Sequence, residues 1–306
     1  MASMKQIKQR KKTVESTGKI TKAMKLVATV KLQKTKQVAT SVVPYFDAMY
    51  EKITSVIKHS HSLKHKYLNG KPDAKRGIVV FSSNKGLAGG YNSSIVKKLV
   101  GDDAEIKISP NDTVIYAVGS KVRDELSRRG FEIARDYSEN MEDVHYGRYV
   151  AVAEDLLDDF VNGKINEIYL VYTYFKNTIT HIPRILKLLP FENVQKNTDD
   201  DSELIKHRTF QVAKSSYEDD ANMPMNYELE DEEMLNQIIP LYISTLLYGA
   251  LTASIASENG ARMTAMDNAT KNAKELSEKL GVMYNRARQG AITQELTEIV
   301  AGANAI

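Results

Sequence analysis

The apolar residues at the start of the chain recur every seven positions, from about Met4 to His59. The positions that share this repeat are Ile7, Val14, Thr21, Ala28, Thr35, Val42, Met49 and Val56. Such spacing is typical of helices that supercoil left-handedly around a partner helix. The positions three residues later mix packing residues with charged ones: Arg10, Thr17, Met24, Lys31, Val38, Tyr45 and Lys52. The pattern predicts one long helix with a weak seam, kinked at Pro44, where a backbone hydrogen bond is lost.

The end of the chain carries a matching pattern from about Asp231 onward, with a predicted kink at Pro240. Its repeat is occupied by Met266, Ala273, Leu280 and Ala287, with Ala269, Leu276 and Met283 between them. A straight helix from Leu241 to Ile306 would extend roughly 100 Å. Because no compact domain of this size is that wide, we expect the two ends of the chain to wind around each other as an antiparallel coiled coil.

The middle of the chain changes to the pattern of a sheet. Runs of β-branched and aromatic residues stand at 78–83 (IVVFSS), 113–120 (TVIYAVGS) and 167–175 (EIYLVYTYF), with helical spacing between them. Strands that alternate with helices predict an open, largely parallel, Rossmann-like α/β sheet. The segment near 182–213 is a candidate for further sheet at one edge. We therefore expect three parts: an N-terminal coiled-coil helix at 1–60, an α/β domain at 61–230 and a C-terminal coiled-coil helix at 231–306.

The stretch 234–257 (MLNQIIPLYISTLLYGALTASIAS) carries no charge, and about 20 apolar residues are enough to cross a bilayer. Two interpretations are open, a membrane span and a buried helix packed against the sheet. Polar residues dilute the stretch heavily: Asn236, Gln237, Ser244, Thr245, Thr252, Ser254 and Ser257. The buried helix is the favoured interpretation.

Charge is segregated along the chain, although the formal net charge is only +3. Between Lys5 and Lys36 lysine and arginine stand against the single acid Glu15, whereas acids dominate from Asp199 to Glu233. The basic arm fits three interpretations: a solvated helix face, a surface for acidic loops of a protein partner, or a nucleic-acid site. No aromatic residue that could stack on bases appears before Tyr45, so nucleic acid is not expected as a partner.

Several kinds of chemistry are excluded or disfavoured by the composition. The chain has no cysteine, so thiolate nucleophiles, thiolate metal sites and disulfides are excluded. His59, His61 and His65 do not share one helical face, and we interpret their segment as a solvated linker. The amino terminus lacks the apolar core of a signal peptide, which favours the cytoplasm. We expect no catalytic residue, no metal and no cofactor.

The strongest signal for an enzyme is the glycine-rich turn between the first strand and the next helix, SSNKGLAGGYN at 82–92. A strand, a glycine turn and a helix can present backbone N–H groups to a phosphate. However, the spacing of Gly86, Gly89 and Gly90 fits neither the dinucleotide fingerprint nor the P-loop. A nucleotide-binding α/β enzyme that uses the Gly86–Gly90 turn stays the alternative function.

Four segments together resemble the gamma subunit of bacterial F-type ATP synthases. They are KITKAMKLVATVKL at 19–32, SSNKGLAGGYN at 82–92, ARMTAMDNATKNA at 261–273 and YNRARQGAITQELTEIVAGA at 284–303. The resemblance implies a non-catalytic central-stalk rotor subunit that couples rotation of a membrane c ring, driven by proton flow, to ATP synthesis or hydrolysis in a hexamer of alpha and beta subunits. The implied partners are alpha, beta, epsilon and the c ring. The implied location is the cytoplasmic face of the cell membrane, peripheral and attached only through the complex.

The resemblance also implies contact residues. Contacts with the catch loops of beta fall on Arg288, Gln289, Thr293, Glu295, Arg262, Met24 and Lys25. The loop of the α/β domain that faces the c ring and epsilon is represented by Lys85, Gly86, Gly89, Gly90 and Asn92. The basic arm then has a partner, because the beta loops of this family are acidic.

Overall fold

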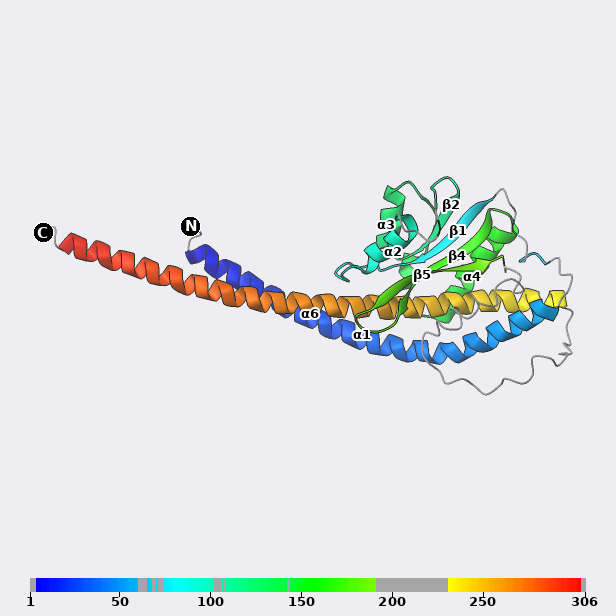
Figure 1. Ribbon diagram of the computed structural model, residues 1–306, viewed down its shortest axis with the longest axis horizontal. Coiled ribbons are helices and arrows are strands. Elements are labelled where there is room, and N and C mark those ends of the chain that lie inside the picture. Colours follow the sequence, from blue (N-terminus) through cyan, green and yellow to red (C-terminus); the bar gives the residue numbers. More distant parts are fainter. Residues whose placement is uncertain are drawn as a thin grey trace. The chain divides into compact units, whose positions relative to one another are not determined.

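The computed structural model describes residues 4–59, 65–67, 70, 74–101, 106, 108–141, 144–190 and 231–303, with side chains for all of these except 39–59, 140, 231 and 302. Two compact units are present (Figure 1). The helical-pair unit consists of Met1–Val30 and Arg262–Ile306, and the sheet unit consists of Lys31–Ala261. The three parts expected from the sequence have their boundaries at 60/61 and 230/231, where the long helices end. This division of the chain stays a prediction.

Two long helices account for both ends of the chain, as the heptad patterns predicted. Helix α1 is Met4–His59 and helix α6 is Asp231–Ala303, and the helical assignment runs unbroken through Pro44 and Pro240. Within the helical-pair unit the two helices are antiparallel. In the contacts across the seam, the residue numbers rise along α1 while they fall along α6. These contacts are Lys11 with Gly281, Glu15 with Ser277, Gly18 with Ala273, Thr21 with Thr270, and Lys25 with Asp267.

The seam lies one residue away from several of its predicted positions. The main repeat is confirmed, since Ile7, Thr21, Ala28, Met266 and Leu280 are all buried. The predicted companions Thr17, Leu276 and Met283 are exposed, and their C-terminal neighbours Gly18, Ser277 and Tyr284 are half-buried instead. A heptad allows spacings of three then four residues or the reverse, and at these three positions the seam follows the spacing of four. The two helices approach closely at Gly18, because a Cβ there would already lie 3.3 Å from Ala273 Cβ.

The sheet unit holds a five-stranded sheet of order β3-β2-β1-β4-β5. Its strands are β1 (Lys75–Phe81), β2 (Thr113–Val118), β3 (Glu132–Asp136), β4 (Ile165–Phe175) and β5 (His181–Leu189). All pairs are parallel except β4 with β5. The predicted open, largely parallel sheet is confirmed, and the candidate edge at 182–213 supplies β5; residues 191–213 lie outside the described residues.

Helices cover both faces of this sheet (Figure 1). Helices α2 (Tyr91–Val100) and α3 (Ser120–Arg128) pack on the face that carries Ile78, Val80 and Ile115. Helix α4 (Tyr146–Val161) and the apolar part of α6 pack on the face that carries Val79 and Phe81. The alternation of side chains along each strand therefore supplies two cores from one sheet. A 3-10 turn, η1 (Ser138–Met141), follows β3.

The uncharged stretch at 234–257 is the helix that fills the second core. Leu235, Ile239, Ile243, Leu247 and Leu251 of α6 are fully buried there. By length and composition, one helix among the described residues (Glu232–Ala301) could cross a membrane, but 72% of its most apolar window is buried inside the protein. The interpretation of this stretch as a buried helix against the sheet is confirmed.

The expected solvated linker is wrong at His65. Its side chain is 2% exposed and lies 3.3 Å from the Asn236 amide oxygen of α6. Burial lowers the pKa of His65 below its ordinary value, which favours the neutral ring. The residue therefore belongs to the packing around α6. His59 and His61 have no described side chains.

Candidate functional site

The glycine-rich turn at 82–92 is a closed loop between β1 and α2. Its two ends are tied by the side chain of Asn92, which accepts a hydrogen bond from Ser83 N (3.1 Å) and donates one to Ser83 Oγ (2.7 Å). Gly89 has a φ of 57°, in the left-handed region that glycine adopts without strain. The loop is therefore held in one shape by its own polar groups.

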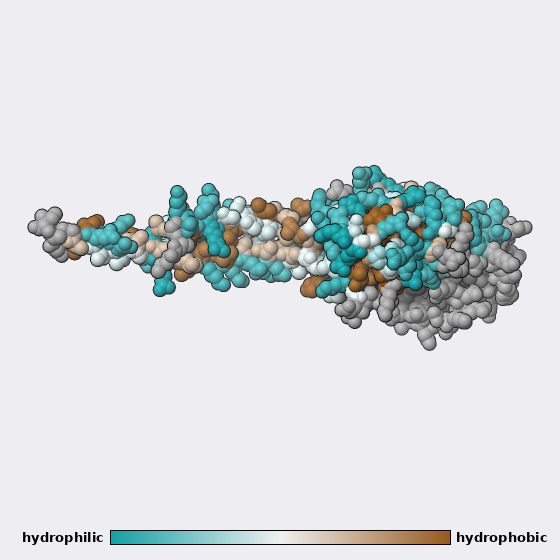
Figure 2. All heavy atoms as spheres, turned by 90° about the horizontal axis from the view of Figure 1, so that it is seen from above, coloured by the Kyte–Doolittle hydropathy of each residue, from teal (hydrophilic) through white to brown (hydrophobic). Residues whose placement is uncertain are grey.

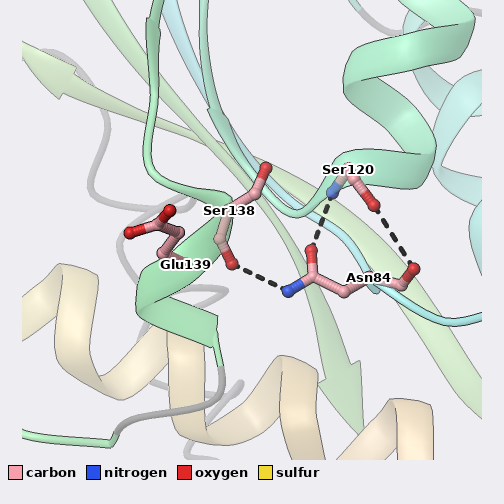
Figure 3. Close-up of a pocket in the computed structure, with 4 residues that line it drawn as sticks. All are labelled: Asn84, Ser120, Ser138 and Glu139. Atoms are coloured by element: carbon pink, nitrogen blue, oxygen red, sulfur yellow. Dashed lines mark hydrogen bonds between the residues drawn. The ribbon is translucent and has the colours of Figure 1, made fainter.

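The N-terminus of α3 lies beside this loop and is already capped by it (Figure 3). Ser120 N donates to Asn84 Oδ1 at 2.9 Å, and the Asn84 amide donates to the Ser138 carbonyl at 2.8 Å. Lys121 N donates to the Ser83 carbonyl at 3.1 Å. The first N–H groups of a helix are the ones that would bind a phosphate. In this fold they are occupied by the chain itself.

Close packing before α3 depends on Gly119. Its φ is 121°, and a Cβ there would lie 2.2 Å from the Ser82 carbonyl oxygen. Ser82 Oγ in turn donates to the Gly119 carbonyl at 3.0 Å. The crevice at the carboxyl ends of β1 and β2, where a dinucleotide fold binds its ligand, is thus filled by backbone and small side chains. An open pocket remains outside it, lined by Asn84, Ser120, Ser138 and Glu139.

This arrangement argues against the nucleotide-binding alternative. The pocket is lined by no basic side chain, and one of its four lining residues is the acid Glu139, which points away from Asn84 (Figure 3). A phosphate would have to displace Asn84 from α3, and none of the four lining residues carries a positive charge to compensate. Among the described residues no group of His, Cys, Asp or Glu could hold a metal ion.

Replacing Asn84 with alanine is expected to destabilise the sheet unit by about 0.5–2 kcal/mol, the usual effect of losing a helix cap. The reason is that Ser120 N and the Ser138 carbonyl both lose their partner. Urea unfolding of Asn84→Ala against the parent measures it, and saturable binding of ATP by either protein would contradict the capped arrangement. Asn111→Ala is a matched control, since Asn111 lies in an exposed turn.

Of the predicted loop residues, Lys85, Gly86, Gly89 and Gly90 are exposed, whereas Asn92 is half-buried and structural. The sequence analysis missed the side chain at the tip of the loop, Leu87. It is 62% exposed and has a φ of 62°, which is rare for a residue with a branched side chain. An apolar group held rigidly in solvent is a contact candidate, but the strained backbone that presents it leaves no signal in the sequence.

The residues predicted to contact the catch loops of beta form two groups within the helical-pair unit. Arg288, Gln289, Thr293 and Glu295 are all exposed on α6. Arg262 is half-buried. It stands 26 residues before Arg288, which is about 39 Å along the helix. Met24 and Lys25 of α1 lie near it, because Lys25 pairs with Asp267. The structure therefore brings Met24, Lys25 and Arg262 to one region and leaves the other four in a separate one.

Lys25 is already engaged within the chain. Its ammonium lies 2.6 Å from Asp267 Oδ1, and Lys271 lies 2.9 Å from the other oxygen. The hydrogen bond from Lys25, followed by that from Lys271, lowers the pKa of Asp267 to about 2. This carboxylate is therefore charged at any physiological pH, and part of the positive charge of Lys25 is neutralised across the seam.

Apolar side chains on the surface of the helical-pair unit are a second feature that the sequence analysis missed. Figure 2 shows apolar and polar groups alternating along this surface. The exposed large apolar residues are Met4, Ile20, Leu26, Val27 and Val30 on α1 and Leu276, Val282, Met283, Ile292, Leu296, Ile299 and Val300 on α6. The signal was the mixed heptad itself, since apolar residues that are not in the seam must face outward. Exposed apolar groups in such number mark an interaction surface.

Comparison with known proteins gives consistent matches along the whole chain. A family model described as ATP synthase matches residues 3–306. The ATP synthase gamma chain of Lachnoclostridium phytofermentans is 49% identical over 308 residues, covering 100% of both chains. The sodium-ion-specific ATP synthase gamma chain of Acetobacterium woodii is 37% identical and covers 98% of this chain and 97% of its own.

Two solved structures share the fold. The central stalk and c ring of the mitochondrial ATP synthase of Tetrahymena thermophila contain a chain that matches with a TM-score of 0.53 and 26% identity, over 82% of this chain and 99% of that one. A chain of the mitochondrial ATP synthase of Euglena gracilis matches with a TM-score of 0.63 and 18% identity, over 99% of this chain and 94% of that one.

Proposed function

Because this chain belongs to the gamma-chain family of ATP synthases, we propose that it is the rotor shaft of the complex and carries no catalytic site of its own. The family model and the relatives confirm the resemblance found in the sequence, and the chain is a subunit of the ATP synthase complex. One observation supports the mechanical role above the others: an antiparallel helical pair with small side chains at its close approach, which also exposes many apolar residues on its outer surface.

The physical argument concerns what a rotating shaft needs. Its two helices must stay together, which the Gly18–Ala273 approach and the Thr21–Thr270 hydrogen bond of 2.8 Å provide. Its outer surface must touch the surrounding subunits without a deep minimum in interaction free energy at any one rotational position. A fully buried Leu or Ile contributes about 1.5–3 kcal/mol, so scattered, partly exposed residues such as Ile292 and Leu296 give many shallow contacts.

The proposed partners are the alpha and beta subunits around the helical-pair unit, with epsilon and the c ring at the sheet unit. Arg288, Gln289, Thr293 and Glu295 are proposed to contact beta, together with Arg262, Met24 and Lys25. The loop residues Lys85, Gly86, Gly89, Gly90 and Asn92 are proposed to face the c ring and epsilon. The chain is proposed to be peripheral, at the cytoplasmic face of the cell membrane, with protons as the coupling ion.

The proposal is tested by mixing the chain with the alpha and beta subunits of the same source. We expect a complex that contains a single copy of this chain, by native mass, and ATP hydrolysis that depends on its presence. A folded chain that stays alone in this mixture would overturn the proposal. The coupling ion is tested in the whole complex, where a requirement for sodium would overturn the choice of protons.

A pair of substitutions at the exposed end of α6 tests the contact with beta. Gln289 and Thr293 lie one turn apart, and Thr293 Oγ1 donates to the Gln289 carbonyl at 2.9 Å. We expect Gln289→Ala and Thr293→Ala each to leave folding unchanged and to lower ATP turnover in the complex. Their combined effect should differ from the sum of the two, because neighbouring contacts couple by about 0.5–3 kcal/mol.

The control for this pair is Gln294→Ala, an exposed residue that bonds Glu298 of the same helix at 3.0 Å. It should change turnover less than either of the two substitutions. Strict additivity of Gln289→Ala and Thr293→Ala, or an equal loss in the control, would contradict the assigned contact.

A further inference from the structure

Strand β4 extends beyond its neighbour β1 at the carboxyl end of the sheet. The pairing of β4 with β1 ends at Val171 opposite Val80, whereas β4 continues to Phe175. On its other side Thr173 is opposite Pro183 of β5, but the N–H and C=O of one residue in an antiparallel strand point to the same side, and those of Thr173 point away from β5. The backbone of Thr173 is nevertheless fully buried, so its polar groups need partners from elsewhere.

Helix α6 supplies these partners through two serines. Thr173 N donates to Ser254 Oγ at 3.2 Å, and Ser257 Oγ donates to the Thr173 carbonyl at 3.0 Å. Both serines are fully buried. They are three residues apart and so lie on the same face of the helix. In effect α6 takes the place of the missing strand beside Thr173.

Two further contacts surround this point. Tyr91 of α2 donates from its hydroxyl to the Ser254 carbonyl at 3.2 Å, so a helix from the opposite layer reaches α6 here. One turn further on, a Cβ at Gly260 would lie 2.7 Å from His181 Nε2 and 3.1 Å from the Phe175 ring. The backbone of α6 thus touches the β4–β5 hairpin directly.

These bonds differ from those of two other hydroxyl residues on α6. Thr252 and Thr293 donate to carbonyls of their own helix, and such bonds do not attach the helix to the sheet. Apolar burial holds α6 against the sheet but is non-directional, so it resists rolling and sliding of a helix weakly. Hydrogen bonds from one helical face to both polar groups of a single residue fix rotation and axial position together.

We propose that Ser254 and Ser257, bonded to Thr173, lock α6 rotationally to the sheet unit, so that torque on the sheet unit passes into the remainder of α6 without slip. The inference rests on the rotor function proposed above. It assigns these serines as positioning residues for energy coupling, with no contact to nucleotide or ion. Because α6 is one continuous helix to Ala303, a rotation imposed at Thr173 is carried along it.

The first test measures amide hydrogen exchange in the full chain. In Ser254→Ala the Thr173 amide loses its acceptor, and its protection factor should fall about tenfold, the effect of one hydrogen bond of ordinary strength. Ser244→Ala is the matched control, a buried serine on the same helix that bonds the Tyr146 hydroxyl at 2.9 Å and not the sheet backbone. Unchanged protection at Thr173 in Ser254→Ala, or an equal loss in Ser244→Ala, would overturn the proposed bond.

The second test measures coupling in the assembled membrane complex with Ser254→Ala, Ser257→Ala and their double variant. We expect ATP hydrolysis to be retained while ions pumped per ATP fall, most in the double variant and not in Ser244→Ala. Proportional losses of hydrolysis and pumping, or unchanged coupling in a double variant shown to be folded by circular dichroism, would overturn the lock. If hydrolysis by the parent complex does not depend on this chain, the rotor function itself fails, which is a distinct result.

Discussion

Replacing Leu247 with alanine is expected to destabilise the sheet unit by about 2–5 kcal/mol, the range for truncating a fully buried leucine. Leu247 is 0% exposed and belongs to the core between the sheet, α4 and α6. The side chain is surrounded on all sides, so the structure cannot collapse fully onto the cavity left behind. Leu241 of the same helix is 39% exposed, and Leu241→Ala should change the stability by less than about 1 kcal/mol.

Urea unfolding followed by tyrosine fluorescence measures this difference. The chain has 16 tyrosines and no tryptophan, and every tyrosine except Tyr284 lies within Lys31–Ala261, so the signal reports on the sheet unit. Equal effects of Leu247→Ala and Leu241→Ala would show that this part of α6 is not a core helix. That result would reopen the membrane-span interpretation of 234–257.

Replacing Asp159 with alanine is expected to destabilise the same unit by about 1–3 kcal/mol, because the substitution leaves a buried donor without an acceptor. Tyr116 is 1% exposed and donates from its hydroxyl to Asp159 Oδ2 at 2.8 Å. Lys164 pairs with the other oxygen at 2.7 Å. Combining Asp159→Ala with Tyr116→Phe should recover part of the loss, since the orphaned hydroxyl is then absent.

The effect of Asp159→Ala should depend on pH with a definite sign. Burial opposes ionisation of Asp159, but hydrogen bonds from Lys164 and Tyr116 outweigh it and hold the pKa below the ordinary value. A lowered pKa in the folded state contributes stability that is fully present above the unfolded pKa of about 3.9 and is lost as the pH falls through the folded pKa. The difference between parent and variant should therefore be constant from neutral pH to about pH 5 and shrink below it. A difference that grows with acid would contradict this assignment.

The strands and helices with strong patterns were predictable from the sequence, and those with weak patterns were not. The runs at 78–83, 113–120 and 167–175 lie between two layers of helices, so most of their residues are apolar or aromatic. Strand β3 was missed because it is a short edge strand whose residues alternate between exposed and half-buried. Three of its five residues are charged (Glu132, Arg135 and Asp136) and pair with Lys75, Asp155 and Arg123.

The residues that tie the fold together were less predictable, because their roles depend on contacts far apart in the chain. Ser254 and Ser257 appeared as polar dilution of an apolar helix, and only the length of β4 beyond β1 gives them a purpose. Asn84 appeared as part of a possible phosphate loop, and only the position of α3 shows that its side chain caps a helix. Spacing within a segment predicts its local structure, but it carries no information on which distant backbone group lacks a partner.

The antiparallel contacts between α1 and α6 also restrict how the length of this chain can change in evolution. Contacts from Lys11–Gly281 to Lys25–Asp267 keep one register over four helical turns. One inserted residue turns the following part of a helix by about 100°, so an insertion at Gly18 would leave the pairs on one side of it facing solvent. Insertions and deletions should therefore be purged from 11–25 and 267–281 and accumulate in the loops of the sheet unit. Gene-wide insertion scanning would map this as two intolerant windows of equal length, one in each of the two long helices.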